Sequence, residues 1–221
     1  MNVSRLALLG LFAVSSLVGC QTTREYYYNA WESFGGYAKR ERLVDNVKSA
    51  SKAQEEAKQQ FTSALEQFKS VVAFDGGDLE KMYNKLNDEY EACEDRAETV
   101  HNRIKSVKNV STALFSEWSG EIKQMSDPTL KAKSQQLLDK TKASYDQLAA
   151  RMDSAAASMD PVLKSFKDRV LFIKHNLNAQ AIAALKGTEL ELGKEIDGLI
   201  KQMEASISEA DKFIAELGTK G

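Results

Sequence analysis

Proline is almost missing from this sequence, with two residues in 221, and glycine is sparse, with twelve. Because proline removes a helical hydrogen bond and glycine weakens a helix, their scarcity favours long helices. Histidine is also rare, with two residues, so few side chains are available to bind transition metals or to exchange protons near neutral pH. The sequence therefore predicts a nearly all-α protein and offers little material for a metal or acid–base site.

Neither sign of charge dominates, since the 28% of charged residues leave a formal net charge of -2. Nucleic acid is therefore not expected as a partner, because the binding of a polyanion draws on a positive field. The motifs G-x-x-x-x-G-K, G-x-G-x-x-G and G-x-S-x-G are also missing, and these would mark a nucleotide cradle or a hydrolase nucleophile. Neither a cofactor nor a small-molecule substrate is predicted.

An apolar run occurs near the N-terminus. Arg5 precedes the apolar stretch from Leu6 to Leu17, and small residues then lead to Cys20. A membrane-spanning helix needs about 20 apolar residues, and this run is shorter. A short basic region, an apolar run and small residues are typical of a secretory signal. Residues 1–19 are therefore predicted to be a signal peptide.

The four residues Leu17-Val18-Gly19-Cys20 resemble the lipobox of bacterial lipoproteins, whose cysteine is lipidated and becomes the mature N-terminus. The alternative is an ordinary signal peptide with a chance cysteine. The resemblance implies that Cys20 carries lipid and attaches the mature protein to a membrane without spanning it. In that family, Gln21 in place of aspartate implies the outer membrane, facing the periplasm. Cys93 would then be the one free thiol, so the fold is expected to rest on packing without a disulfide.

Residues 20–36 are predicted to be a lipid-anchored tether. The segment contains five aromatic residues, which are Tyr26, Tyr27, Tyr28, Trp31 and Phe34. Tyrosine and tryptophan suit a membrane interface because the ring is apolar and its polar group stays hydrated. The rings either lie beside the lipid or pack on the end of the folded domain, and the sequence favours neither alternative.

Residues 37–218 are predicted to be a helical bundle domain. From Leu43 to Val71, apolar side chains recur alternately four and three positions apart, with Gln54 as the exception, and the pattern repeats from Tyr83 to Trp118. A period of 3.5 residues over four heptads is typical of a coiled coil. The intervening Asp75-Gly76-Gly77-Asp78 predicts a tight turn, with glycine at the end of one helix and Asp78 as N-cap of the next.

Asp127 and Pro128 predict the start of a third helix, because Asp is a good N-cap and Pro is tolerated at the first helical position. The expected seam of this helix is Leu130, Leu137, Tyr145, Leu148, Met152, Ala155 and Met159. Asp160-Pro161 either starts a new helix or kinks the third one, and Gly187 is expected to precede a last helix from about Thr188 to Gly218. The predicted fold is all-α, an elongated antiparallel coiled-coil-like bundle of three to four long helices, and we favour four.

Few residues point to chemistry. Glu98-Thr99-Val100-His101 has the E-x-x-H spacing of di-iron bundles, but such a site needs a second copy, and His175 follows Phe172 at that spacing. No metal site is therefore expected. Cys93 lies in the second seam, where burial raises the pKa of a thiol and leaves it inert. We interpret the protein as non-enzymatic, and a metal or redox four-helix-bundle enzyme is the least favoured hypothesis.

The segments Phe74-Asp75-Gly76-Gly77-Asp78-Leu79 and Leu171 to Ala179 resemble a family of bacterial proteins described only as a domain of unknown function, over roughly Lys39 to Leu217. The resemblance implies a helical coiled-coil architecture and often a lipoprotein signal, but no activity. The most distinctive polar patch within it consists of Lys174, His175, Asn176 and Asn178. This patch is either a docking surface or a helix break satisfied by amide and imidazole side chains, and we prefer the second interpretation.

Two functional hypotheses follow. The first is a non-enzymatic cell-envelope lipoprotein, a coiled-coil spacer, adaptor or scaffold that binds an envelope protein or a second copy of itself. The alternative is a protein that binds or shapes a membrane surface, as the aromatic tether and the basic residues Lys39, Arg40 and Arg42 indicate. In both hypotheses the membrane is reached through the lipid on Cys20.

Overall fold

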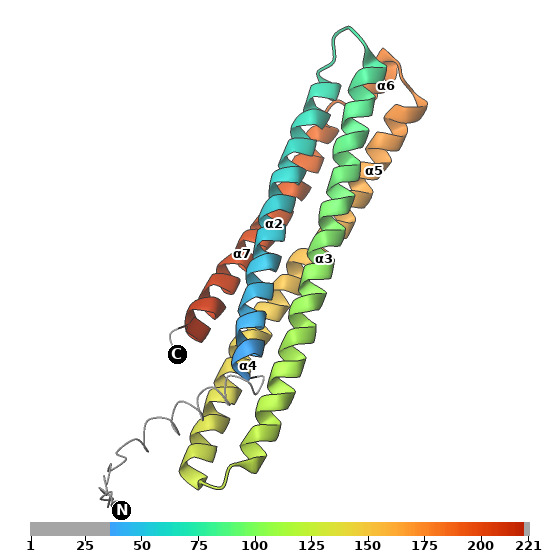
Figure 1. Ribbon diagram of the computed structural model, residues 1–221. Helices are drawn as coiled ribbons and strands as arrows, with labels where there is room; N and C mark the ends of the chain where they lie inside the picture. The colour runs from blue at the N-terminus through green and yellow to red at the C-terminus, as the bar shows by residue number, and fades with distance from the viewer. Residues whose placement is uncertain (1–35, 219–221) are drawn as a thin grey trace, which may run out of the picture.

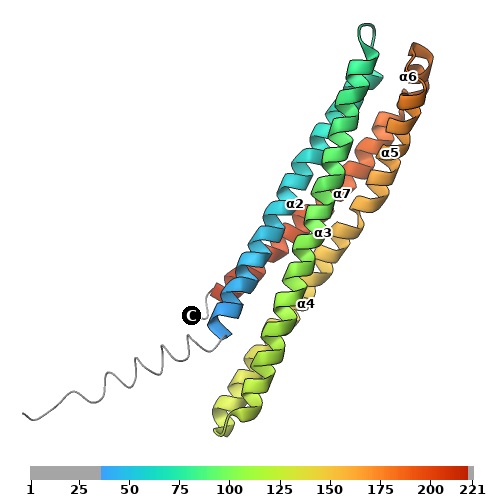
Figure 2. The same cartoon turned by 45° about the vertical axis from the view of Figure 1, so that its right-hand side comes forward.

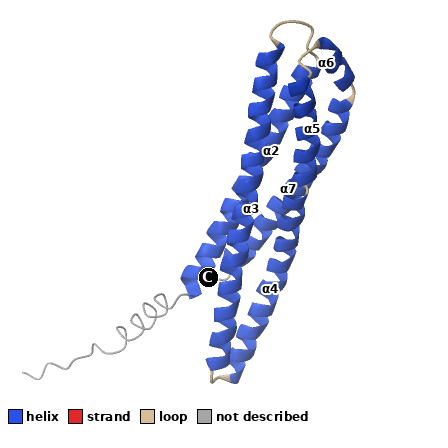
Figure 3. Cartoon of the chain, turned by 90° about the vertical axis from the view of Figure 1, so that its right-hand side faces the viewer, coloured by secondary structure: helices blue, strands red, loops and turns tan. Residues whose placement is uncertain are grey.

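The computed structural model describes residues 36–218, and this part of the chain consists of helices and short connections (Figure 1, Figure 3). The helices are α2 (Gly36–Val72), α3 (Leu79–Gln124), α4 (Pro128–Ala157), α5 (Met159–His175), α6 (Ala179–Leu185) and α7 (Thr188–Gly218). The predicted signal peptide 1–19, the lipidation site Cys20 and residues 20–35 of the tether lie outside the described residues. For the described residues, the all-α prediction is confirmed.

The helices form an up-down-up-down bundle of four antiparallel rods, in which α4 and α5 together make the third rod (Figure 1, Figure 2). α2 packs along α3 and α7, and the α4–α5 rod packs against the same two neighbours. The 46 residues of α3 extend over about 69 Å at a rise of about 1.5 Å per residue. The predicted elongated bundle of four long helices is therefore confirmed.

The predicted heptad seams form the core. Leu43, Phe61 and Phe68 of α2 are fully buried, and α3 buries every predicted seam residue from Tyr83 to Leu114, whereas Trp118 is half-buried. A buried side chain of this size contributes about 1.5–3 kcal/mol relative to an exposed one. The described residues contain one cysteine, Cys93, which is free and buried, so no disulfide links them. The continuous apolar interior holds the fold together instead.

Aromatic side chains join the rods at two levels. Phe166 of α5 makes edge-to-face contacts with Phe68 of α2 at 6.2 Å and with Tyr90 of α3 at 5.6 Å between ring centroids. Toward the other end, Tyr145 of α4 contacts Phe115 of α3 at 5.4 Å and Phe213 of α7 at 6.2 Å. Each such pair adds about 0.5–1.5 kcal/mol beyond area burial. The third rod is thereby fixed to all three of its companions.

The turn between α2 and α3 follows the predicted chemistry. Gly76 and Gly77 have φ values of 153° and 117°, which L side chains rarely adopt. The Asp78 carboxylate accepts a hydrogen bond of 3.0 Å from the Lys81 backbone N–H, and so caps α3. Asp127 caps α4 in the same way, with Pro128 in the first turn. Both predicted helix starts are confirmed.

The structure shows how the chain passes Pro161 and Gly187. Only Ser158, in a near-helical conformation, separates α4 from α5, so Pro161 lies in the first turn after a kink within one rod. Gly187 has a φ of 94° and directly precedes α7, as predicted. The connection between α5 and α7 also contains the short helix α6, which the sequence did not indicate, because its seven residues are too few to show a period.

Two predicted seam residues were wrong, since Leu130 is 59% exposed and Leu137 is 44% exposed. The two have different reasons. Leu137 lies off the buried stripe of α4, because the stripe continues from Tyr145 to Leu138, which is 5% exposed at the same level. Leu130 is exposed because the neighbouring rods are shorter. Near the N-terminus of α2, Lys39 pairs with Glu117 at 2.7 Å, and α7 ends beside Thr141, which lines a small surface depression with Leu217. Past these levels, α3 and α4 continue together as a two-helix projection (Figure 1). We call residues 118–140 of this hairpin the overhang.

Candidate functional site

The described helices contain no group of three or more His, Cys, Asp and Glu side chains able to hold a metal ion. No helix among them has an apolar stretch of the length needed to cross a bilayer. A shallow surface groove lies over α2 and α7 beside Lys58, Gln59, Thr62 and Ile200. The remaining candidate sites are single reactive side chains and the surface of the rod.

Lys58 bridges the α2–α7 groove. Its Nζ lies 3.0 Å from Glu55 Oε2 on its own helix and 3.2 Å from Glu204 Oε1 on α7. The hydrogen bond to Glu55 is the main reason that the pKa of Lys58 is raised, and the bond to Glu204 adds to this, while partial burial opposes it. An ammonium held in this way stays charged and joins two helices, which is a structural role.

Cys93 is fully buried on α3, as its seam position predicts. Burial raises the pKa of its thiol to about 12, the nearby Glu89 carboxylate adds to this, and a hydrogen bond involving Gln60 opposes it. At neutral pH the side chain is therefore a protonated thiol, which is a poor nucleophile and a poor metal ligand.

His101 flanks the α3 seam. Its Nε2 lies 3.5 Å from Asp160 Oδ1 of α5, and its side chain is exposed. The pair links two neighbouring rods at the surface. His175 lies elsewhere, exposed at the end of α5, so the described structure places the two histidines in separate surroundings.

The predicted polar patch divides into two parts. Asn176 donates a hydrogen bond of 3.0 Å from Nδ2 to the Phe172 carbonyl at the end of α5, and Asn178 accepts one of 2.9 Å from the Ala181 N–H at the start of α6. Both amides thus satisfy backbone groups at a helix break, as the preferred interpretation describes. Lys174 and His175 are exposed in the last turn of α5, where positive charge is favourable.

Large apolar side chains surround this break, and sequence reasoning missed most of them. Leu171 is 41% exposed, Phe172 40% and Leu177 43%. Leu177 lies in the connection between α5 and α6, two residues after the end of α5. Leu171 and Phe172 lie outside the helical spacing of the buried residues Val162, Phe166, Val170 and Ile173. This offset in the sequence was the signal that could have predicted their exposure. We call the exposed residues of this end the distal patch, which comprises Leu171, Phe172, Lys174, His175 and Leu177.

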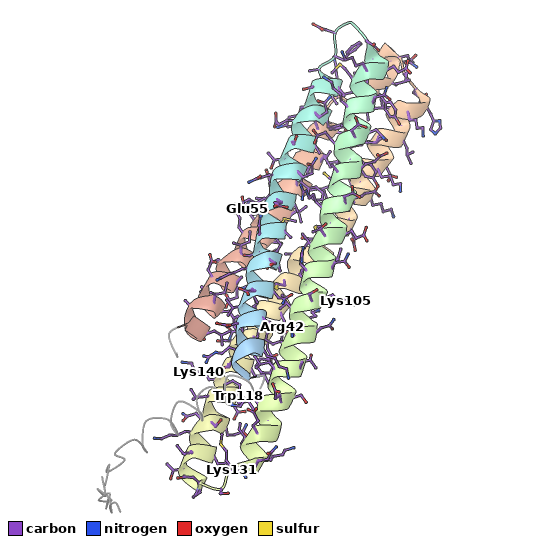
Figure 4. All side chains as sticks on the ribbon, viewed as in Figure 1. Arg42, Glu55, Lys105, Trp118, Lys131 and Lys140 are labelled. Atoms are coloured by element: carbon purple, nitrogen blue, oxygen red, sulfur yellow. The ribbon has the colours of Figure 1, made fainter. Side chains whose placement is uncertain are left out.

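The overhang at the other end has its own internal contacts. Trp118 Nε1 donates to Ser134 Oγ at 2.9 Å, and Lys131 Nζ donates to the Lys123 carbonyl at 3.3 Å, so both bonds tie α3 to α4. Figure 4 shows Trp118 between the two helices, with Lys131 near the tip and Lys140 farther along α4. The distal patch and the overhang thus lie at opposite ends of the rod (Figure 1).

Most of the chain matches a known protein family. The profile of a family described as "Protein of unknown function (DUF2959)" matches residues 27–217 of the chain. This range agrees with the predicted resemblance and extends it toward the N-terminus, into the predicted tether. A search of curated proteins finds no match.

Proposed function

The chain belongs to DUF2959, a family described as of unknown function, and we propose from its geometry that it is a non-enzymatic cell-envelope lipoprotein, a helical spacer that presents a docking end to a protein partner. The anchor in this proposal is lipid on Cys20, and the docking end is the distal patch.

The observation that carries the proposal is the placement of the ends along the rod. α2 begins at the end of the bundle opposite α6 and the distal patch (Figure 1). Cys20 precedes the first residue of α2, Gly36, so an anchor there would attach the opposite end of the rod to the membrane. The distal patch would then stand away from the lipid by a distance set by the helix length, about 69 Å for α3.

The chemistry of the distal patch supports a protein partner. Leu171, Phe172 and Leu177 offer apolar side chains with exposed Lys174 and His175 among them. Apolar residues with a polar rim are the usual composition of a docking surface. The partner that fits is a protein with a small apolar face and acidic residues at its edge.

Attachment is tested by Cys20→Ala. The wild-type protein is expected to incorporate labelled fatty acid and to sediment with outer membranes even at high salt. The variant should incorporate no label and should not sediment with membranes at high salt, because it lacks the acylated thiol. If the wild-type protein sedimented with membranes but incorporated no labelled fatty acid, this result would contradict the lipid anchor.

Docking is tested in the same cells by a photo-crosslinking side chain at Phe172, with a matched one at Lys105, which is exposed on the middle of α3 (Figure 4). A discrete adduct is expected from position 172 and not from 105, and Leu171→Ser with Leu177→Ser should abolish it. Equal adducts from both positions, or none from either, would count against the spacer.

A further inference from the structure

We infer that the overhang is a lipid-contact surface that lies against anionic headgroups. This inference rests on the proposed function, because the anchor on Cys20 would bring this end of the rod to a membrane. It adds a second, non-covalent contact made by the folded domain itself, and it names the residues that make it.

The first observation is an uncovered apolar stripe. Leu130, Leu138 and Tyr145 lie on one face of α4, eight and then seven residues apart. Leu138 and Tyr145 are buried, whereas Leu130 is 59% exposed, because α2 and α7 end before its level. Leu137 lies next to this face and is 44% exposed. The core stripe thus continues into a segment where no described rod covers it.

The second observation is an excess of positive charge around this stripe. The overhang and the two residues that follow it, residues 118–142, contain five lysines and three acidic residues, which are Glu121, Asp127 and Asp139. Lys123, Lys133, Lys140 and Lys142 are exposed, and within the described residues none of them forms an ion pair, in contrast to Lys39 and Lys108 farther along the rod. Unpaired lysines beside exposed leucines are the composition of surfaces that bind anionic lipid.

The third observation is that the rod is electrically polarised. The turn between α2 and α3, with the start of α3, lies at the opposite end, and its residues 73–92 contain six acidic side chains and two lysines. Lys174 and Lys186 of the same end offset only part of this negative charge. An anionic surface attracts the overhang and repels this acidic end, so the charge pattern selects one orientation. In that orientation, α2 begins in the half of the rod that faces the membrane (Figure 1).

These observations favour lipid over a protein partner. A protein ligand for the overhang would have to supply both an apolar strip and acidic groups, whereas an anionic bilayer supplies both and is already adjacent in the proposed function. Lysines on flexible stems and a leucine pair without a pocket fit a fluid surface, because neither requires a fixed partner geometry.

The inference is tested with the protein from Gln21 to Gly221, which carries no acyl chain and keeps every described helix. It is sedimented with vesicles of phosphatidylethanolamine and phosphatidylglycerol, and with neutral phosphatidylcholine vesicles. We expect about tenfold stronger binding to the anionic vesicles, and a loss of this preference at high salt. Lys133→Glu with Lys140→Glu, or Leu130→Ser with Leu137→Ser, should each weaken binding about tenfold.

Matched changes at the other end serve as controls. Lys164→Glu with Lys174→Glu, and Leu171→Ser with Phe172→Ser, alter exposed lysine and large apolar side chains on α5 and should leave vesicle binding unchanged. Circular dichroism checks that every variant keeps its helicity, which is expected because all these side chains lie on the surface.

Three results would overturn the inference. Equal binding by the overhang variants and the wild type would assign any lipid contact to the aromatic residues of the tether. A loss of self-association in the overhang variants without vesicles would assign the surface to a second copy of the chain. An absence of binding to anionic vesicles would leave no lipid contact at all. Because this protein lacks the acyl chain, failure of the Cys20 anchor would not alter these measurements.

Discussion

At the scale of single residues, the bundle tolerates a polar side chain inside its core. Gln54, the exception in the predicted α2 seam, is fully buried, and neither its Oε1 nor its Nε2 has a hydrogen-bond partner within the described structure. Ser206 of α7 is also fully buried with an unpaired hydroxyl, and the Lys58–Glu204 pair places it near the level of Gln54. Buried polar residues of this kind cost stability and can fix the register of helices.

Gln54→Leu should therefore stabilise the protein, because it removes an unpaired amide from the core and adds apolar contact. An increase of about 1–3 kcal/mol in the free energy of unfolding is expected, corresponding to a rise in Tm of about 2–4 °C for each kcal/mol. Gln59→Leu is the control, because Gln59 is exposed on the same helix. This substitution should change the free energy of unfolding by no more than about 0.5 kcal/mol. Destabilisation by Gln54→Leu would mean that the amide is satisfied in solution, for example by a buried water.

At the scale of elements, the sequence predicted most of the fold because each signal is local. The 3.5-residue period identified the buried faces of α2 and α3, and Asp78, Asp127 and Gly187 marked helix ends through caps and backbone conformations that depend on near neighbours. What failed depends on other elements. The period placed Leu130 on the inner side of α4, but its exposure depends on where α2 and α7 end, and spacing within α4 carries no information on this. Leu137 is instead an error of register, because the buried stripe of α4 runs through its neighbour Leu138.

The turn before α3 gives a prediction at this scale. Gly77 has a φ of 117°, so Gly77→Ala should cost about 1–2 kcal/mol through backbone strain, although an added Cβ meets nothing nearer than Phe74 at 3.8 Å. Gly198→Ala should have the opposite sign, a gain of about 0.5–1 kcal/mol, because Gly198 is exposed within α7 and its Cβ would meet open space.

Urea denaturation of both variants measures the two changes in the free energy of unfolding. Because the substitution is the same at both positions, the comparison isolates the backbone conformation. Equal effects at both glycines would contradict the conformation of the turn.

The same distinction between local and distant information applies to the candidate site. The sequence identified Lys174, His175, Asn176 and Asn178 as an unusual polar run, and their placement at a helix break shows why asparagine occurs there. It did not identify the overhang, because the overhang exists only where α3 and α4 continue past the ends of α2 and α7 (Figure 1). Nor did it show that the two ends differ in charge, since the net charge of -2 averages over them.

At the scale of the whole molecule, the question is how the rod stands relative to a membrane. The acidic end and the basic overhang favour an upright rod that is attached at one end. A rod lying flat would instead place its whole length against lipid, as the alternative membrane-surface hypothesis requires. These two orientations differ in the position of the turn between α2 and α3, which either stands far from the bilayer or touches it.

Two single-cysteine labels distinguish the orientations. Ser126→Cys places a fluorophore at the tip of the overhang and Asp75→Cys places one in the opposite turn, both on exposed positions. The native Cys93 should remain unlabelled, because it is fully buried and burial raises the pKa of its thiol to about 12. With the lipidated protein in vesicles that carry a headgroup quencher, the label at 126 should be quenched and the label at 75 should not, since the rod separates them by about 69 Å, the length of α3. Quenching of both labels to the same extent would show that the rod lies along the surface, and the spacer would then have to be abandoned.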